Sequence, residues 1–408
     1  MNKKKIIIAE IKEEGSTNGV SRYIEMLREG LYSENFEIVC LVFIFSTMIR
    51  LHKHIKHQNY TEIIIPLPIN PHTINKSYWN DEYNHIVSYI LRNELMGKFI
   101  FHIQTMNLIQ LAIYLRANYD CKIVSHIHCI PWKYLYEDNK RHFNHIFKRI
   151  YIEEDTDDNY FKTFTIEEEY LICSKSDAII CVTKSSKNYY ETYLHTCPEK
   201  VHFIPNGLKD RCENQVLFED ITKKNPICIL YVGTVSKAKG VHLLLEALNI
   251  IESKGYNFEL IIAGKITEEM KKEIKRKPKL KIKLLGQVSF DTLCSLYKKA
   301  HIGVITSLFE QCSYVAIEMS MFALPTVYSG IEELHEIFDK NAGMFIPALY
   351  NTNTGLTLDK KVLASKIELL INSPFLRRKI GQIERTKYLQ EFTLEKMINR
   401  TIKVYNSL

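Results

Sequence analysis

The stretch that decides the fold is residues 300–330, AHIGVITSLFEQCSYVAIEMSMFALPTVYSG. It begins with a short apolar run at 301–305, which is long enough for one buried parallel strand. After a turn, residues 313–323 repeat apolar side chains at helical spacing, so they predict a helix. Pro325 cannot continue that helix, and it restricts the residue before it to extended geometry. The segment therefore predicts a strand, a turn and a helix in succession.

Two glutamates and a serine in this segment outline a binding site. Glu310 lies in the turn, Ser313 is the expected N-cap, and Glu318 lies about a turn and a half into the helix. The free N–H groups of the first helical turn favour a phosphate at the carboxyl edge of a parallel sheet. The two carboxylates would then hold hydroxyls of a sugar or a ribose. The alternative is that both glutamates are solvated surface residues, because short motifs recur by chance.

The composition indicates a globular protein with two domains. The chain has 408 residues, which is long for one hydrophobic core, and it is 46% hydrophobic and 25% charged. Ten cysteines occur without a C-x-x-C pair or a zinc-site spacing, as is usual for a reduced cytosolic protein. The N-terminal apolar run is shorter than a signal-peptide core, and no apolar segment reaches the ~20 residues of a membrane span. We therefore expect a cytoplasmic protein.

The net charge is +7, and lysines are dense at 265–283. A solvated basic face is one interpretation of this segment. Peripheral contact with anionic lipid at the inner membrane face, or with an anionic acceptor, is the other. The excess is too dispersed to indicate nucleic-acid binding. The acidic stretch at 154–158 lacks the spacing of a metal site.

The first half of the chain alternates between strand and helix patterns. A strand at 5–9, a glycine-containing loop at 15–19 and a helix at 20–31 are typical of the start of a Rossmann-like half, although G-x-G-x-x-G is absent. Gly19 either only turns the chain or lets the loop approach a phosphate. Further strands are expected at 37–45, 61–66, 99–103, 122–127, 177–183 and 201–207, and helices at 82–95 and 108–117. This alternation predicts a doubly wound parallel sheet of the α/β class.

The second half repeats the alternation after a polar linker at 209–226. Strands are expected at 227–233, 259–264, 282–286, 301–305, 326–328 and 345–347, and helices at 290–300, 313–323, 359–373 and 374–408. The region 133–170 interrupts the pattern with a basic aromatic half followed by an acidic one. It could rest on a membrane surface or pack on the N-terminal core.

Two histidines stand at the end of an expected strand, His126 and His128 in SHIHCIPW. In doubly wound sheets, sites lie just beyond the carboxyl ends of the strands. A neutral imidazole there could donate a hydrogen bond to a sugar or to a developing charge. A histidine near a strand end is also often structural, so the residues alone leave both interpretations open.

The segment from Glu310 to Glu318 resembles the E-x7-E motif of retaining glycosyltransferases of the GT-B fold, the large group 1 or family 4-like glycosyltransferases. The motif usually begins E-x-F-G, and Cys312-Ser313 replaces Phe-Gly here. The loop VGTVSKAKG resembles the family's V-G-R-x-x-x-x-K-G, with Lys239 on its lysine. Thr234 stands in place of its arginine. Two further segments match the family, DAIICVT at 177–183 and the P-N-G signature in VHFIPNG at 201–207. His128 matches the family histidine, although Cys129 replaces the acidic residue that usually follows it. Gly19 matches one glycine of the family's Gly-Gly pair, and Asn18 stands where the other is usual.

The resemblance implies a GT-B fold, in which two Rossmann-like doubly wound parallel-sheet domains face a cleft and the C-terminal helices cross back to the first domain. We expect an N-terminal acceptor-side domain at 1–208, the linker at 209–226 and a nucleotide-sugar donor domain at 227–385. Residues 386–408 are then the helix that packs back on the first domain.

The resemblance also implies transfer of a sugar, with retention and without a metal or cofactor, from a UDP- or GDP-linked donor to a saccharide, lipid-linked or peptide acceptor. Glu310, which holds the sugar hydroxyls, and His128, beside the reacting carbon, are the implied catalytic residues. The implied donor-binding residues are Gly19 and Gly233 in loops, Lys237 in place of the missing arginine, Lys239 and the backbone of Ser313, Tyr314 and Val315 on the diphosphate, and Glu318 on the ribose.

Three alternatives stay open at this stage. A nucleotide-sugar epimerase shares the architecture and would convert its donor without an acceptor. An inactive partner that binds a sugar nucleotide would explain Thr234 and Cys312. A structural protein is the third. Donor sugar, base, acceptor, linkage and oligomeric state are not given by the sequence, because one fold supports many activities.

Overall fold

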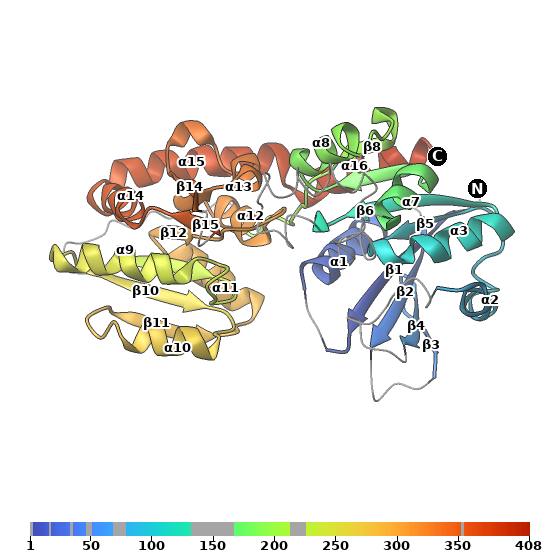
Figure 1. Cartoon of the computed structure of the whole chain (residues 1–408), viewed down its shortest axis with the longest axis horizontal. Helices are drawn as coiled ribbons and strands as arrows, with labels where there is room; N and C mark the ends of the chain where they lie inside the picture. The colour runs from blue at the N-terminus through green and yellow to red at the C-terminus, as the bar shows by residue number, and fades with distance from the viewer. Residues whose placement is uncertain are drawn as a thin grey trace. The chain divides into compact units, whose positions relative to one another are not determined.

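The structure is a computed structural model that describes residues 3–15, 18–32, 36–45, 51–67, 79–131, 167–212, 226–351 and 355–408 (Figure 1). Most of the predicted linker and nearly all of the charged region 133–170, with its acidic stretch 154–158, lie outside these residues. The chain divides into two compact units. Among the described residues, unit 1 contains those up to Pro131, those from Glu167 to Asn206, and Leu394–Leu408. Unit 2 contains those from Gly207 to Thr393.

Unit 1 is built on an eight-stranded sheet in the order β3-β4-β2-β1-β5-β6-β7-β8. All neighbouring strands are parallel except β3 and β4. The strands are β1 (Lys4–Glu13), β2 (Phe36–Phe45), β3 (Lys53–Lys56), β4 (Thr61–Leu67), β5 (Phe99–Ile103), β6 (Cys121–Ile127), β7 (Ala178–Cys181) and β8 (Val201–Phe203). The helices are α1 (Gly19–Tyr32), α2 (Asp81–Ile90), α3 (Ile109–Asn118), α7 (Glu167–Lys175), α8 (Lys184–Thr192) and α16 (Leu394–Asn406).

Unit 2 has a seven-stranded sheet in the order β11-β10-β9-β12-β13-β14-β15, in which only the β14–β15 pair is antiparallel. The strands are β9 (Ile227–Val232), β10 (Phe258–Ala263), β11 (Ile282–Gly286), β12 (Ile302–Ile305), β13 (Thr326–Gly330), β14 (Phe345–Asn351) and β15 (Gly355–Leu358). The helices are α9 (Val241–Ser253), α10 (Glu268–Lys275), α11 (Phe290–Lys299), α12 (Tyr314–Met321), α13 (Glu332–Ile337), α14 (Lys360–Asn372) and α15 (Pro374–Glu391). Helix α9 packs on α14, and α12 packs on α15 (Figure 1).

The apolar runs seen in the sequence form the buried strands of both sheets. Ile6, Ile7 and Ile8 in β1 are at most 1% exposed. Burial on both faces is expected where helices flank a parallel sheet, so such strands are continuously apolar rather than alternating. The α/β architecture of two doubly wound sheets predicted from the sequence is therefore confirmed.

The local predictions differ from the structure in several places. The short strands β3 and β15 were not expected; every residue of β3 is exposed, so no buried alternation marks it in the sequence. Helix α2 ends at Ile90 instead of residue 95. The single helix expected at 374–408 is two helices, α15 and α16. They separate where the N–H of Leu208 donates to Phe392 O at 2.9 Å and Leu208 pairs with Thr393.

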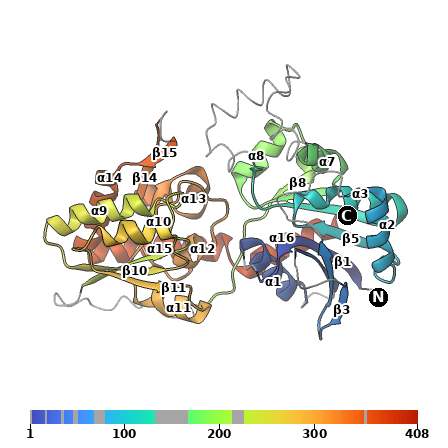
Figure 2. The ribbon, with the colours of Figure 1, turned by 60° about the horizontal axis from the view of Figure 1, so that its bottom comes forward.

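The second of these helices belongs to unit 1, where α16 packs against α1 (Figure 2). The approach is close at Gly30, because a Cβ there would stand 2.2 Å from Ile398 Cγ1. The last helix of the chain therefore completes the core of the first unit.

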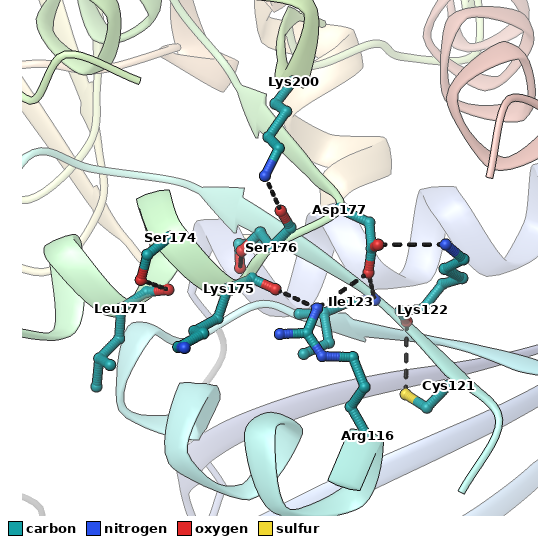
Figure 3. Close-up of polar contacts among 11 residues, drawn as sticks. Arg116, Cys121, Lys122, Ile123, Leu171, Ser174, Lys175, Ser176, Asp177 and Lys200 are labelled. Carbon is teal, nitrogen blue, oxygen red and sulfur yellow. Dashed lines mark hydrogen bonds and ion pairs between the residues drawn. The ribbon is translucent and has the colours of Figure 1, made fainter. Parts of the chain in front are cut away.

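The aspartate of the segment DAIICVT ties three elements of unit 1 together (Figure 3). Asp177 Oδ2 accepts the backbone N–H of Ile123 at 2.8 Å, while the Asp177 N–H donates to Ile123 O at 2.8 Å. Its carboxylate also accepts from Lys122 Nζ at 3.3 Å and from Arg116 Nη1 at 3.4 Å. Asp177 therefore fixes the start of β7 against β6 and α3, which is a structural role.

Replacing Asp177 with alanine should lower the free energy of unfolding by about 1–3 kcal/mol, because the N–H of Ile123 loses its acceptor. Urea unfolding of the purified variant measures this change. Asp120→Ala is the matched control, since the Asp120 carboxylate lies 3.8 Å from Lys98 Nζ in an exposed pair. It should cost at most about 0.5 kcal/mol. Equal losses in the two variants would contradict the anchoring role.

Candidate functional site

The candidate donor site lies at the carboxyl ends of β9 and β12 in unit 2. These two strands are neighbours at the point where the strand order reverses, since β10 follows β9 on one side and β13 follows β12 on the other. Loops that leave such a switch point diverge and form a ligand-binding crevice. The loops here are 233–240, which leads into α9, and 306–313, which leads into α12.

Gly240 allows these two loops to approach closely. It lies just before α9 with φ +65°, and a Cβ built on it would stand 2.1 Å from Thr306 O. The approach is held by Thr306 Oγ1, which donates to Lys239 O at 2.9 Å, and by the N–H of Leu308, which donates to Ala238 O at 3.3 Å. A glycine at this position is therefore required by both the backbone angle and the space.

This approach pairs two of the predicted site residues. Lys239 Nζ donates to Glu310 Oε1 at 2.7 Å and lies 3.5 Å from Phe309 O. The side chains are only 34% and 15% exposed, so the pair is partly shielded from water. Lysine and glutamate thus meet at one point of the sheet edge although 71 residues separate them in the sequence.

The N-terminus of α12 stands beside this pair. Ser313 occupies the N-cap position with extended backbone angles, as the sequence predicts, but its side chain makes no capping hydrogen bond. The helix runs for eight residues from Tyr314, and Val315 lies in its first turn. The N–H groups of the first helical turn and the positive end of the helix dipole suit an anion next to Lys239.

Glu318 lies deeper than its partner in the motif. It is 1% exposed in α12, and its Oε2 accepts a hydrogen bond from Tyr297 Oη at 2.6 Å. Tyr297 belongs to α11 and was not identified from the sequence. The structure therefore brings Glu310 to Lys239 and Glu318 to Tyr297.

Thr234 stands in place of the family arginine, and Lys237 was predicted to supply the missing charge. Both are exposed residues of the 233–240 loop. Lys237 Nζ lies 2.7 Å from Glu269 Oε1 on α10, and this partner raises the pKa of the lysine. Both side chains are more than half exposed, at 63% and 61%. Gly233 has φ +132° at the end of β9. The structure therefore pairs Lys237 with α10, whereas Lys239 is paired with Glu310.

In unit 1 the carboxyl ends of β5 and β6 carry a cluster of three histidines. His128, half-buried, places Nε2 at 2.8 Å from Gln104 Oε1, and its ring stacks on His126 with 4.3 Å between centroids. His102 follows on the other side of His126, and its Nδ1 lies 2.6 Å from Tyr405 Oη on α16. Burial lowers the pKa of His102 and His128 to about 3 and that of His126 well below its usual value.

Gln104 is the hydrogen-bonding partner of His128. Its side-chain amide lies 2.8 Å from Nε2 of the imidazole. The hydrogen bond from this imidazole to a sugar stays a prediction. Gln104, just after β5, was missed because a single glutamine at a strand end carries no recognisable pattern.

The other predicted residue of unit 1, Gly19, is exposed and begins α1. Residues 16–17 of its loop lie outside the described part. Close to this end of α1, Glu10 of β1 is 5% exposed, and its carboxylate lies 3.3 Å from Ser21 Oγ and 3.2 Å from Lys12 Nζ. Glu10 was not singled out in the sequence, where it continues an apolar run without a motif.

The buried histidines predict a pH-dependent stability. An unfolded histidine has a pKa near 6.5, so below that pH the unfolded chain binds protons that the folded cluster does not. The stabilisation is therefore complete above pH 6.5 and decreases as the pH falls towards about 3. Urea unfolding at pH 7.5 and 5 should show a smaller loss for His126→Phe than for the wild type. His85→Phe, at an exposed position, should not change the loss; equal behaviour of all three proteins would contradict the prediction.

Among the described residues, no group of three or more histidine, cysteine, aspartate or glutamate side chains is arranged to hold a metal ion. None of their helices combines the length and apolar character that crossing a membrane requires.

Comparisons with known families cover both halves of the chain. Residues 17–210 match the model of Glycosyltransferase Family 4, and residues 214–387 match that of Glycosyl transferases group 1. The chain is 26% identical over 266 residues to the capsular polysaccharide biosynthesis glycosyltransferase CapM of Staphylococcus aureus, which is 61% of this chain. It is 27% identical over 249 residues to an uncharacterised glycosyltransferase of Methanocaldococcus jannaschii, which is 57% of this chain. The chain spans 66% of the length of each of these relatives.

Solved structures extend the likeness to the whole fold. The sucrose-phosphate synthase of Thermosynechococcus elongatus superposes with a TM-score of 0.72 at 15% identity and covers 99% of both chains. The HepE protein of Anabaena, solved in complex with UDP, superposes with a TM-score of 0.66 at 14% identity and covers 99% of this chain and all of its own. At such identities the likeness concerns the fold, and it is that of GT-B proteins. Matched by family models along both halves and folded in this way, the chain belongs to the group 1, family 4-like glycosyltransferases.

Proposed function

We propose that this protein transfers a sugar from a nucleotide-diphosphate sugar to an acceptor, and that unit 2 binds the donor. The observation that carries the proposal is the Lys239–Glu310 pair, 2.7 Å long, at the switch point of the sheet and beside the N-terminus of α12. The lysine cation, the N-terminus of the helix and the carboxylate together suit a ligand that has both a phosphate and hydroxyl groups.

In this proposal the donor exchanges partners with the ion pair. The diphosphate takes the Lys239 ammonium and the N–H groups at Ser313, Tyr314 and Val315, because an anion of higher charge competes with a single carboxylate. Glu310 is then released to accept hydrogen bonds from the hydroxyls of the donor sugar. Positive groups at the leaving diphosphate stabilise the charge that develops as the glycosidic bond breaks.

Retention and independence from a metal are proposed from the family resemblance. Attack by the acceptor on the face from which the phosphate departs would retain the anomeric configuration without a protein nucleophile. Lys239 and the helix dipole would supply the neutralisation that a metal supplies in other phosphate chemistry. For His128 of unit 1 we keep the predicted hydrogen bond to the sugar.

Donor base and acceptor are proposed by class. The HepE complex supports UDP as the nucleoside diphosphate of the donor, and GDP is the second candidate. Similarity to CapM supports an acceptor in cell-surface polysaccharide biosynthesis, and lipid-linked saccharides and peptides are the further candidates. We propose a cytoplasmic enzyme without a cofactor that contacts the inner membrane face peripherally through its basic segments.

The test begins with binding. Purified protein is melted in the presence of UDP-, GDP-, ADP- and dTDP-sugars, and one base should raise the Tm. A ligand at 100 times its Kd stabilises by about 2.7 kcal/mol. Glu310→Gln should reduce this shift, whereas Glu269→Gln, at the exposed partner of Lys237, should not. The absence of a shift with every sugar nucleotide would overturn the donor site.

Turnover then separates the alternatives. Labelled sugar that appears on a saccharide, lipid-linked or peptide acceptor supports the transferase. Conversion of the donor without any acceptor would indicate an epimerase. Binding without turnover across the acceptor panel would indicate an inactive partner.

A further inference from the structure

The carboxylate of Glu318 meets α11 deep in unit 2. Tyr297 Oη donates to Glu318 Oε2 at 2.6 Å, and both side chains are only 1% exposed. The bond is short for an O–H···O hydrogen bond, so it constrains the direction of the carboxylate. Burial and then Glu318 raise the pKa of the thiol of Cys294, three residues before Tyr297 on α11.

Packing fixes the ring that makes this bond. Tyr297 stacks on Phe322 with 5.4 Å between centroids and 17° between ring planes. Phe322 is the C-cap residue of α12 and follows Glu318 by four residues, about one helical turn. A planar side chain clamped at its ring and bonded at its hydroxyl has little rotational freedom. The tyrosine therefore holds Glu318 in one orientation.

A carboxylate that is fixed in this way presents its oxygens in one direction. A glutamate side chain has two oxygens that accept hydrogen bonds, and Tyr297 donates to Oε2. Such a pair of oxygens suits two adjacent hydroxyl groups, as on the 2′ and 3′ carbons of a ribose.

We propose that Tyr297 is a positioning residue that orients Glu318 to recognise the ribose of the donor. The inference rests on the proposed function, because it takes Glu318 as the ribose-binding group. It assigns to α11 a part in the choice between ribose and 2′-deoxyribose nucleotides. Tyr297 itself touches Glu318 and Phe322 and acts on the nucleotide only through the carboxylate.

The experiment compares ribose with deoxyribose ligands. The Kd values of UDP, GDP and their 2′-deoxy counterparts are measured by calorimetry for the wild type and for Tyr297→Phe, which keeps the ring and removes the hydroxyl. The wild type should bind one of the ribose ligands about tenfold more tightly than its deoxy form, and the variant should bind the two within about threefold. In turnover, KM for the donor should rise while kcat stays within about twofold.

Tyr388→Phe is the matched control. Tyr388 is also buried in unit 2, and its Oη donates to Leu208 O at 2.9 Å, so the variant loses a buried hydrogen bond that does not involve Glu318. It should lower the Tm as Tyr297→Phe does and keep the wild-type preference for ribose.

Two results would overturn the inference, and they differ in what they imply for the proposed function. A Tyr297→Phe variant that keeps the full ribose preference would make the tyrosine a core residue only and leave the donor site intact. A wild type that binds none of the four nucleotides would remove the proposed function together with the inference.

Discussion

Replacing Lys239 with alanine should lower kcat/KM for the nucleotide-sugar by about 100-fold or more, since one preorganised charge at a developing anion typically contributes this much. Its ammonium is 2.7 Å from Glu310 and beside the N-terminus of α12, where the leaving diphosphate is proposed to lie. Initial rates of labelled-sugar transfer over a range of donor concentrations measure the loss. The Tm of the variant, recorded in parallel, shows whether the fold is retained.

Lys237→Ala is the control within the same loop. Lys237 has the same charge two residues away, but its ion pair with Glu269 is more than half exposed. Exposed pairs contribute little, so kcat/KM should change by less than about threefold. If Lys237→Ala were as damaging as Lys239→Ala, Lys237 would fill the place of the missing arginine. If neither variant lost activity, the diphosphate would have to bind elsewhere.

Replacing Gly240 with alanine should lower the free energy of unfolding of unit 2 by about 2–5 kcal/mol, as left-handed backbone strain adds to a steric overlap. The backbone has φ +65°, and the new Cβ would stand 2.1 Å from the carbonyl oxygen of Thr306. Relief of this overlap must separate the two loops that carry Lys239 and Glu310. Binding of the sugar nucleotide should therefore weaken together with stability, which urea unfolding and calorimetry measure on one preparation.

Gly255→Ala separates the two causes. Gly255 follows α9 with φ +83°, and no atom lies within 4 Å of a Cβ built there. This variant has the strain alone, at about 1–2 kcal/mol, and should bind the donor normally. Equal losses at Gly240 and Gly255 would mean that the close approach of the loops contributes nothing.

The order of strands and helices was largely accessible from the sequence because each buried strand is one apolar run that periodicity detects. β1, β9 and β12 are of this kind, and α12 was marked by its helical spacing and by Pro325. The edge strand β3 was missed because all four of its residues are exposed and leave no buried pattern. Strand β15, of four residues, was missed as well. The break between α15 and α16 was not predicted for another reason. It lies where residues 392–393 contact Leu208, which is far away in the sequence.

The sequence by itself determined the residue types of the candidate site, since Lys239, Glu310, Ser313 and Glu318 stand in motifs of local spacing. Only the tertiary structure decided how they pair. Lys239 meets Glu310 because β9 and β12 are neighbours in the sheet and Gly240 allows their loops to touch. Glu318 meets Tyr297 because Tyr297 of α11 stacks on Phe322, the residue that follows α12. Local spacing reports which face of one element a residue occupies, whereas an ion pair or hydrogen bond between elements depends on long-range packing that no local pattern contains.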